Sequence, residues 1–139
     1  MKNSLFHLLH LTDPTLPIGG YSHSAGLETY VQNGKVKDPE TARTFVTEML
    51  NRNIRYTDAA FVSLAYDAAK LEDLKTLATL DQECSAVKLP MEMRQASLKL
   101  GMRLLKIFQP MIQKDIADQY RKMILEKSAD GHYCIVFGL

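Results

Sequence analysis

Residues 11–31 read LTDPTLPIGGYSHSAGLETYV and form the most distinctive stretch of this 139-residue chain. Pro14 and Pro17 fix the backbone angle φ and oppose helix formation, so the stretch begins as a loop. Gly19 and Gly20 allow backbone conformations that a side chain would hinder. We therefore expect a short, rigid loop that leads into a helix.

The second half of the stretch has the pattern of a helix start. Ser22 or Ser24 can act as the N-cap, because a serine hydroxyl accepts a hydrogen bond from a backbone amide of the first turn. The helix is then expected to run as far as Gly34, a residue type that often follows the last helical turn. Four polar side chains are expected to gather beside the loop: Tyr21, Ser22, His23 and Glu28.

The rest of the chain reads as a succession of amphipathic helices, because apolar residues recur at three- and four-residue intervals. Asp38-Pro39 is a strong helix start, with a capping acid before a proline at the first helical position. Further helices are expected at or after these positions: 4–11, Thr57-Asp58, 71–88, Pro90 and 112–127. Residues 134–137 alone read as a strand. The expected fold is all-α, a bundle of about six or seven helices in a single domain over residues 1–139.

Composition limits the possible functions. The chain has 17 basic and 16 acidic residues and a net charge of +1, so no electrostatic case exists for nucleic-acid binding. No stretch approaches the ~18 apolar residues that a membrane span requires. Two cysteines, Cys84 and Cys134, are too few and too far apart in sequence for a disulfide framework. Free thiols in a reducing cytoplasm are therefore expected.

Metal-ligating side chains are present but scattered. His7 and His10 are three residues apart and can share a helix face, yet a stable metal site needs a third or fourth ligand. His132 and Cys134 supply two ligands for a soft metal, which is also too few for a tight site. We expect no stable metal and no cofactor.

Residues 20–24, Gly-Tyr-Ser-His-Ser, come close to the nucleophile elbow of serine hydrolases. That motif has glycine where Ser24 stands and follows a strand, whereas here a proline-bearing loop leads in. A small helical hydrolase that uses Ser22 and His23 is therefore kept as the alternative function.

A protein-binding surface is the main interpretation of the loop. Rigid turn residues alternate with the apolar Leu16 and Ile18, and mixed apolar and polar groups on a preorganised loop suit partner contact. The candidate partner-binding residues are Leu16, Pro17, Gly19, Gly20, Tyr21, Ser22, His23 and Glu28. Glu92 and Arg94 near a helix start are a surface ion pair or a second partner contact, and both readings stay open.

Five segments carry a resemblance to a known family. They are residues 12–31, Asp58-Ala-Ala, 77–81, 92–97 with Gly101, and 131–138. In this order and spacing they resemble UreF, the urease accessory protein. The resemblance covers nearly all of the chain, and its first segment is the most specific.

The resemblance implies a non-catalytic chaperone component rather than an enzyme. UreF proteins assemble with the accessory protein UreD (also called UreH), with the GTPase UreG and with apo-urease, and the complex inserts nickel into the urease active site. Modulation of GTP hydrolysis, homodimerisation and a cytoplasmic location are implied as well. Family members are longer, and their residues matching 134–137 begin a further helix. The bundle is therefore expected to be C-terminally incomplete, without the family's last helices.

Overall fold

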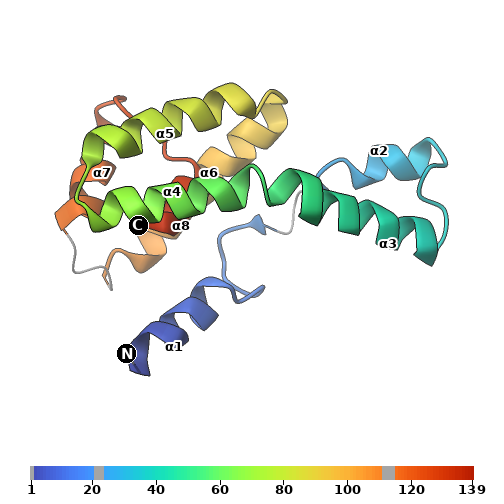
Figure 1. The fold of residues 1–139 in the computed structure, drawn as a ribbon, viewed down its shortest axis with the longest axis horizontal. Helices are drawn as coiled ribbons and strands as arrows, with labels where there is room; N and C mark the ends of the chain where they lie inside the picture. The colour runs from blue at the N-terminus through green and yellow to red at the C-terminus, as the bar shows by residue number, and fades with distance from the viewer. Residues whose placement is uncertain (1, 21–23, 111–114) are drawn as a thin grey trace.

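The computed structural model describes the backbone of residues 2–20, 24–110 and 115–139, and over these residues it contains helices, turns and loops but no strand (Figure 1). The elements are α1 (Lys2–Leu11), α2 (Leu27–Gln32), α3 (Pro39–Glu48), η2 (Met49–Ile54), α4 (Asp58–Lys70), α5 (Leu74–Val87), α6 (Met91–Phe108), α7 (Asp115–Leu125) and α8 (Tyr133–Gly138). The prediction of an all-α fold is confirmed. None of these described helices combines the length and the apolar character needed to cross a lipid bilayer.

Helix α8 lies at the centre of the bundle, packed between α4 and α6 (Figure 1). Helix α5 packs against α4, and α7 packs against α5. The largest aliphatic and aromatic side chains that are fully buried come one from each of four helices: Leu77, Leu104, Tyr120 and Ile135. One apolar core therefore joins α5, α6, α7 and α8.

Two glycines allow the centre of the bundle to pack closely. A Cβ atom at Gly101 of α6 would overlap the carbonyl oxygen of Gly131, which lies just before α8. A Cβ atom at Gly138, the last residue of α8, would lie 2.7 Å from the carbonyl oxygen of Val62 on α4. A glycine inside a helix costs roughly 1 kcal/mol relative to alanine. At Gly101 that cost is offset by an approach of two backbones that no other residue permits.

The hairpin of α2 and α3 projects from one end of the bundle, and η2 continues α3 toward α4 (Figure 1). The rings of Tyr30 and Phe45 pack against each other across this hairpin, with their centroids 5.2 Å apart. Helix α3 starts as predicted, because the Asp38 carboxylate accepts a hydrogen bond of 2.8 Å from the amide of Thr41. In return the Thr41 hydroxyl accepts one from the amide of Asp38.

Helix α2 begins later than a serine cap would place it. Its N-cap is Gly26, with φ of +90°, and no side chain caps the helix. Ser24 contributes its carbonyl oxygen, not its hydroxyl, to the amide of Leu27. The prediction of Ser24 as the capping side chain is therefore wrong, and the alternative, Ser22, lies outside the described residues.

Residues 134–137 are helical, although they read as a strand in isolation. They belong to α8, where Cys134, Ile135 and Val136 are buried. Packing of their β-branched side chains between α4 and α6 overrides their strand preference. A helix at this position, which the family resemblance implies, is present as α8.

Candidate partner-binding groove

The loop after α1 is shaped by one of its own carboxylates. Asp13 accepts hydrogen bonds from the amide of Thr15 at 2.8 Å and from its hydroxyl at 2.6 Å. The amide of Leu16 donates to the Asp13 carbonyl oxygen. The two bonds from Thr15, the one from its hydroxyl above all, hold the pKa of Asp13 below its ordinary value. The ionised carboxylate thus fixes the turn around Pro14.

The other end of the loop is tied to α6. The amide of Ile18 donates to the carbonyl oxygen of Leu16 at 2.7 Å, which closes a tight turn over Pro17. Arg103 of α6 donates from Nη1 to the carbonyl oxygen of Ile18 at 3.0 Å. Gly19 has φ of +83°, and a Cβ atom there would overlap the Arg103 guanidinium group. The loop is therefore preorganised at both ends, and Gly19 is required by conformation and by space.

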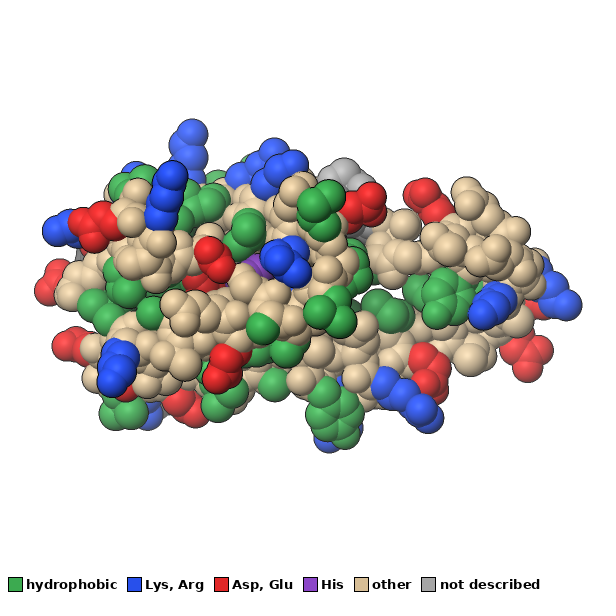
Figure 2. All heavy atoms as spheres, turned by 90° about the horizontal axis from the view of Figure 1, so that it is seen from above, with side chains coloured by type: hydrophobic (Ala, Val, Ile, Leu, Met, Phe, Trp, Pro, Cys, Tyr) green, Lys and Arg blue, Asp and Glu red, His purple; other side chains and the backbone are tan. Residues whose placement is uncertain are grey.

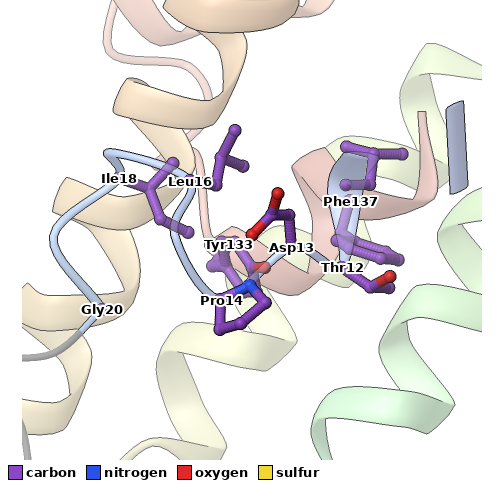
Figure 3. A pocket seen from close by; sticks show the side chains of 9 residues that line it. Thr12, Asp13, Pro14, Leu16, Ile18, Gly20, Tyr133 and Phe137 are labelled. Carbon is purple, nitrogen blue, oxygen red and sulfur yellow. The ribbon is translucent and has the colours of Figure 1, made fainter. Parts of the chain in front are cut away.

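A groove of about 520 Å³ lies between this loop and α8 (Figure 3). Its lining combines loop residues with two aromatic residues of α8, and we call it the loop groove: Leu11, Thr12, Asp13, Pro14, Leu16, Ile18, Gly20, Tyr133 and Phe137. The Tyr133 and Phe137 rings pack on each other, with 5.9 Å between their centroids. Apolar side chains dominate the groove, and Asp13 supplies its one carboxylate among these lining residues.

The α8 wall of the groove is positioned by a buried carboxylate that the sequence interpretation missed. Asp81 of α5 is fully buried and accepts hydrogen bonds from three consecutive amides that lead into α8. These amides belong to Asp130, Gly131 and His132, and the last two bonds measure 2.8 and 3.0 Å. An acceptor at the start of a helix also interacts favourably with the helix dipole. We call this arrangement the Asp81 anchor.

The imidazole of His132 forms a second buried link beside the anchor. Its Nδ1 lies 3.0 Å from the Ser97 hydroxyl, and its Nε2 lies 2.8 Å from the Ser85 hydroxyl. Ser85 donates its proton to Asp130, so it must accept from Nε2. Ser97 accepts from the amide of Tyr133, so its own proton is directed to Nδ1. The donors and acceptors therefore fit one neutral tautomer, protonated on Nε2.

The surroundings of His132 favour this neutral form. Burial lowers the pKa of His132 and outweighs the opposing effect of the Asp81 carboxylate. A protonated ring would aim an Nδ1–H donor at Ser97, whose hydroxyl proton already points at the ring, so two donors would face each other there. The Ser85–His132–Ser97 chain is closed off from solvent at the ring, so it serves to join α5, α6 and α8.

The structure divides the predicted loop residues into anchors and exposed groups. Leu16 is only 8% exposed and packs in the core, so its side chain holds the loop in place and presents only a small part of its surface to the groove. Gly19 is half-buried beside Arg103. Pro17 and Gly20 are exposed. Tyr21, Ser22 and His23 lie outside the described residues.

The other three predicted residues lie away from the loop groove. Glu28 is exposed on α2, in the projecting hairpin (Figure 1). Glu92 is exposed in the first turn of α6. Arg94 is half-buried and donates to the carbonyl oxygens of Lys88 at 3.1 Å and Leu89 at 3.5 Å, which ties α6 to the end of α5. No ion pair between Glu92 and Arg94 occurs in the described part of the chain.

Neither the surface charges nor the metal-ligating side chains form a concentrated site in the described part of the chain. Figure 2 shows acidic and basic side chains interspersed over the face seen from above, without an extended area of one sign. In the ranges that the structure describes, no three His, Cys, Asp or Glu side chains are grouped to hold a metal ion. The loop groove is kept as the candidate recognition site because residues of the predicted partner-binding loop line it.

Comparisons with known proteins all point to one family. A sequence model of the UreF family matches residues 36–139. A protein of Actinobacillus pleuropneumoniae serotype 5b named urease accessory protein UreF is 47% identical over 95% of this chain. Proteins of the same name are 46% identical over 95% of the chain in Haemophilus influenzae strain PittGG and 31% identical over 99% of it in Bacillus sp. strain TB-90.

These relatives are longer than the chain. The aligned region makes up 58% of the Actinobacillus protein, 56% of the Haemophilus protein and 60% of the Bacillus protein. The family match and the three names agree with the resemblance drawn from the sequence motifs. They give no support to the alternative of a hydrolase built on Ser22 and His23.

We predict that Gly19→Ala loosens the loop whereas Gly20→Ala does not. Alanine at Gly19 must adopt a left-handed conformation and displace Arg103, which costs about 1–2 kcal/mol locally. Gly20 has no atom within 4 Å of its Cβ position, so Gly20→Ala is the matched control. Hydrogen exchange of the Ile18 amide should become roughly 5- to 30-fold faster in Gly19→Ala. Equal exchange in the two variants would contradict this reading of Gly19.

We also predict that His132 makes the fold sensitive to mild acid. The unfolded chain takes up a proton on this histidine below about pH 6.5, whereas the folded chain, in which its pKa is lowered, does not. The unfolding free energy should therefore fall by up to about 1.4 kcal/mol between pH 7.5 and pH 5.5. Urea unfolding at the two pH values measures this loss.

The pH difference, not the absolute stability, is the readout. His132→Asn should largely remove the difference, even if the variant is less stable at both pH values. His7→Asn is the control and should retain it, because His7 lies on α1 and takes no part in the buried chain. A pH difference that is the same in His132→Asn and in the unaltered chain would refute the assignment.

Proposed function

The chain belongs to the UreF family of urease accessory proteins, and from this premise we propose that it acts in the maturation of urease as a non-catalytic component of the nickel-insertion machinery. The observation that carries the proposal is the loop groove, a preorganised, mostly apolar surface lined in part by the exposed Gly20, with Pro17 exposed on the same loop. Such a surface loses little conformational entropy when a partner binds. Nickel is the cargo of this process, delivered to urease by the assembled complex.

The proposed partners are UreD/UreH, the GTPase UreG and apo-urease, and we assign the loop groove to the GTPase. Its apolar walls fit an apolar side chain of the partner, while the ionised Asp13 at the edge favours a cation next to that side chain. Tyr21, Ser22 and His23 follow Gly20 in the sequence and stay part of the proposed contact, although they lie outside the described residues. Modulation of GTP hydrolysis would require only that the partner's switch loops are held in one geometry.

The exposed Glu28 and Glu92 are proposed as separate, peripheral contacts, since neither lies at the loop groove. Arg94 keeps a role in the proposed contact only through its position beside Glu92, because its guanidinium group is engaged by α5. Residues 1–139 act in this proposal as one domain, corresponding to the aligned part of the longer relatives. A cytoplasmic location and homodimerisation are parts of the proposal that rest on the family alone.

Charge introduced at the rim of the groove tests the assignment. The double variant Pro17→Asp/Gly20→Asp adds two carboxylates at exposed positions of the loop, so the fold should persist while an apolar partner surface would have to bury two unpaired charges. Capture of UreG in a pull-down with UreD/UreH and apo-urease should fall at least about tenfold, a change worth about 1.4 kcal/mol. Nickel-dependent urease activation in the same mixture should fall with it.

The control variant carries the same added charge elsewhere. Gln82→Glu/Ala86→Glu adds two carboxylates to exposed positions of α5, on the far side of the bundle from the loop (Figure 1). This variant should bind and activate like the unaltered chain. If the rim variant, shown to be folded by circular dichroism, captures UreG and supports activation as well as the control does, the loop groove is not the GTPase surface.

A further inference from the structure

The two cysteines of the chain meet in the core, although 50 residues separate them in sequence. Cys84 lies on α5 and Cys134 on α8, and both are fully buried. Their sulfur atoms are 3.4 Å apart and share a hydrogen bond, and both are free thiols. We propose that Cys84 and Cys134 form a redox modification site, a dithiol that converts reversibly to an intramolecular disulfide joining α5 to α8.

The separation of the sulfur atoms is short enough for this reaction. A disulfide bond is about 2.05 Å long, so the two sulfurs must approach each other by roughly 1.4 Å from their present 3.4 Å. Cys134 stands one residue after the first position of α8, close to the Asp81 anchor. A small rotation of the two side chains with a slight shift of this short helix provides the approach without separating α8 from its neighbours.

The electrostatic surroundings favour one thiolate in the pair. The contact between the two sulfur atoms lowers the pKa of Cys134 and raises that of Cys84. The ammonium group of Lys88 favours the thiolate form of both, whereas Asp58, which pairs with Lys88 at 2.7 Å, opposes it. Cys134 is therefore the nucleophile and Cys84 the resolving thiol.

The reaction with a small two-electron azo oxidant, diamide, shows how the step balances. The Cys134 thiolate adds to one nitrogen of the N=N bond and forms an S–N bond, and the other nitrogen takes up a proton. Cys84, deprotonated as it reacts, then attacks the sulfur of Cys134, so that the S–S bond forms and the S–N bond breaks. The reduced hydrazine leaves with two electrons and two protons, and the protein has lost two hydrogen atoms.

Oxidation of the purified 139-residue chain by diamide tests the proposal. The folded protein should lose two hydrogen atoms by intact mass without forming dimers, and dithiothreitol should restore the original mass. The assignment is unambiguous because the sequence has only these two cysteines. The disulfide closes a 50-residue loop, so the oxidised form should melt at a temperature higher by on the order of 5–10 °C.

Two single variants serve as controls for the chemistry. Cys84→Ser and Cys134→Ser each retain one thiol, so neither should give a monomer that lacks two hydrogen atoms. The proposal is overturned if the unaltered chain keeps both thiols under these conditions, if it forms only intermolecular dimers, or if the disulfide appears only in urea concentrations that unfold it. Formation of the disulfide in the folded monomer supports it.

Discussion

The carboxylate of Asp81 is the constraint on which the centre of this structure depends. A fully buried acidic side chain is costly unless its oxygens are satisfied, and here three consecutive amides of residues 130–132 satisfy them. Hydrogen bonds to a charged acceptor are worth about 1.5–3 kcal/mol each, so this contact determines where the short helix α8 begins. A six-residue helix would not be stable without such support.

The shape of the loop groove depends on where α8 lies. Tyr133 and Phe137 form one wall, and they are carried by α8 directly after the amides that Asp81 holds. The opposite wall is the loop, which Asp13 shapes at one end and Arg103 of α6 holds at the other. Because Gly101 of α6 admits the backbone of Gly131, the helix that ties down the loop is also the one that packs on the start of α8.

The sequence predicts the helices well and their meeting points poorly. Proline, capping and periodicity signals are local, so the all-α fold and the Asp38 helix start are confirmed. Ser24 does not cap α2, because the backbone at Gly26 decides where that helix begins. Residues 134–137 read as a strand in isolation but are helical, because packing decides there. Three of the motif segments that resemble UreF supply Asp81, Ser97 and His132, but no local pattern shows that these side chains touch. Likewise, the sequence separation of Cys84 and Cys134 hides their contact. Only the loop residues of the groove could be predicted from the sequence, because Tyr133 and Phe137 of the other wall lie more than 100 residues later in the chain.

Hydrogen exchange of the α8 amides in Asp81→Asn is the most direct test of this central role. An asparagine side chain has one acceptor oxygen, so it cannot accept hydrogen bonds from all three amides. We predict that the amides of Gly131 and His132 are protected from exchange in the unaltered chain. In Asp81→Asn these amides and those of α8 should exchange at least about tenfold faster. If exchange in the variant is faster only in the region of α8, while the amides of α4 stay protected, then Asp81 is what holds α8 and the groove wall that it forms. Unchanged protection of Gly131, His132 and α8 in Asp81→Asn would show that packing alone positions this helix.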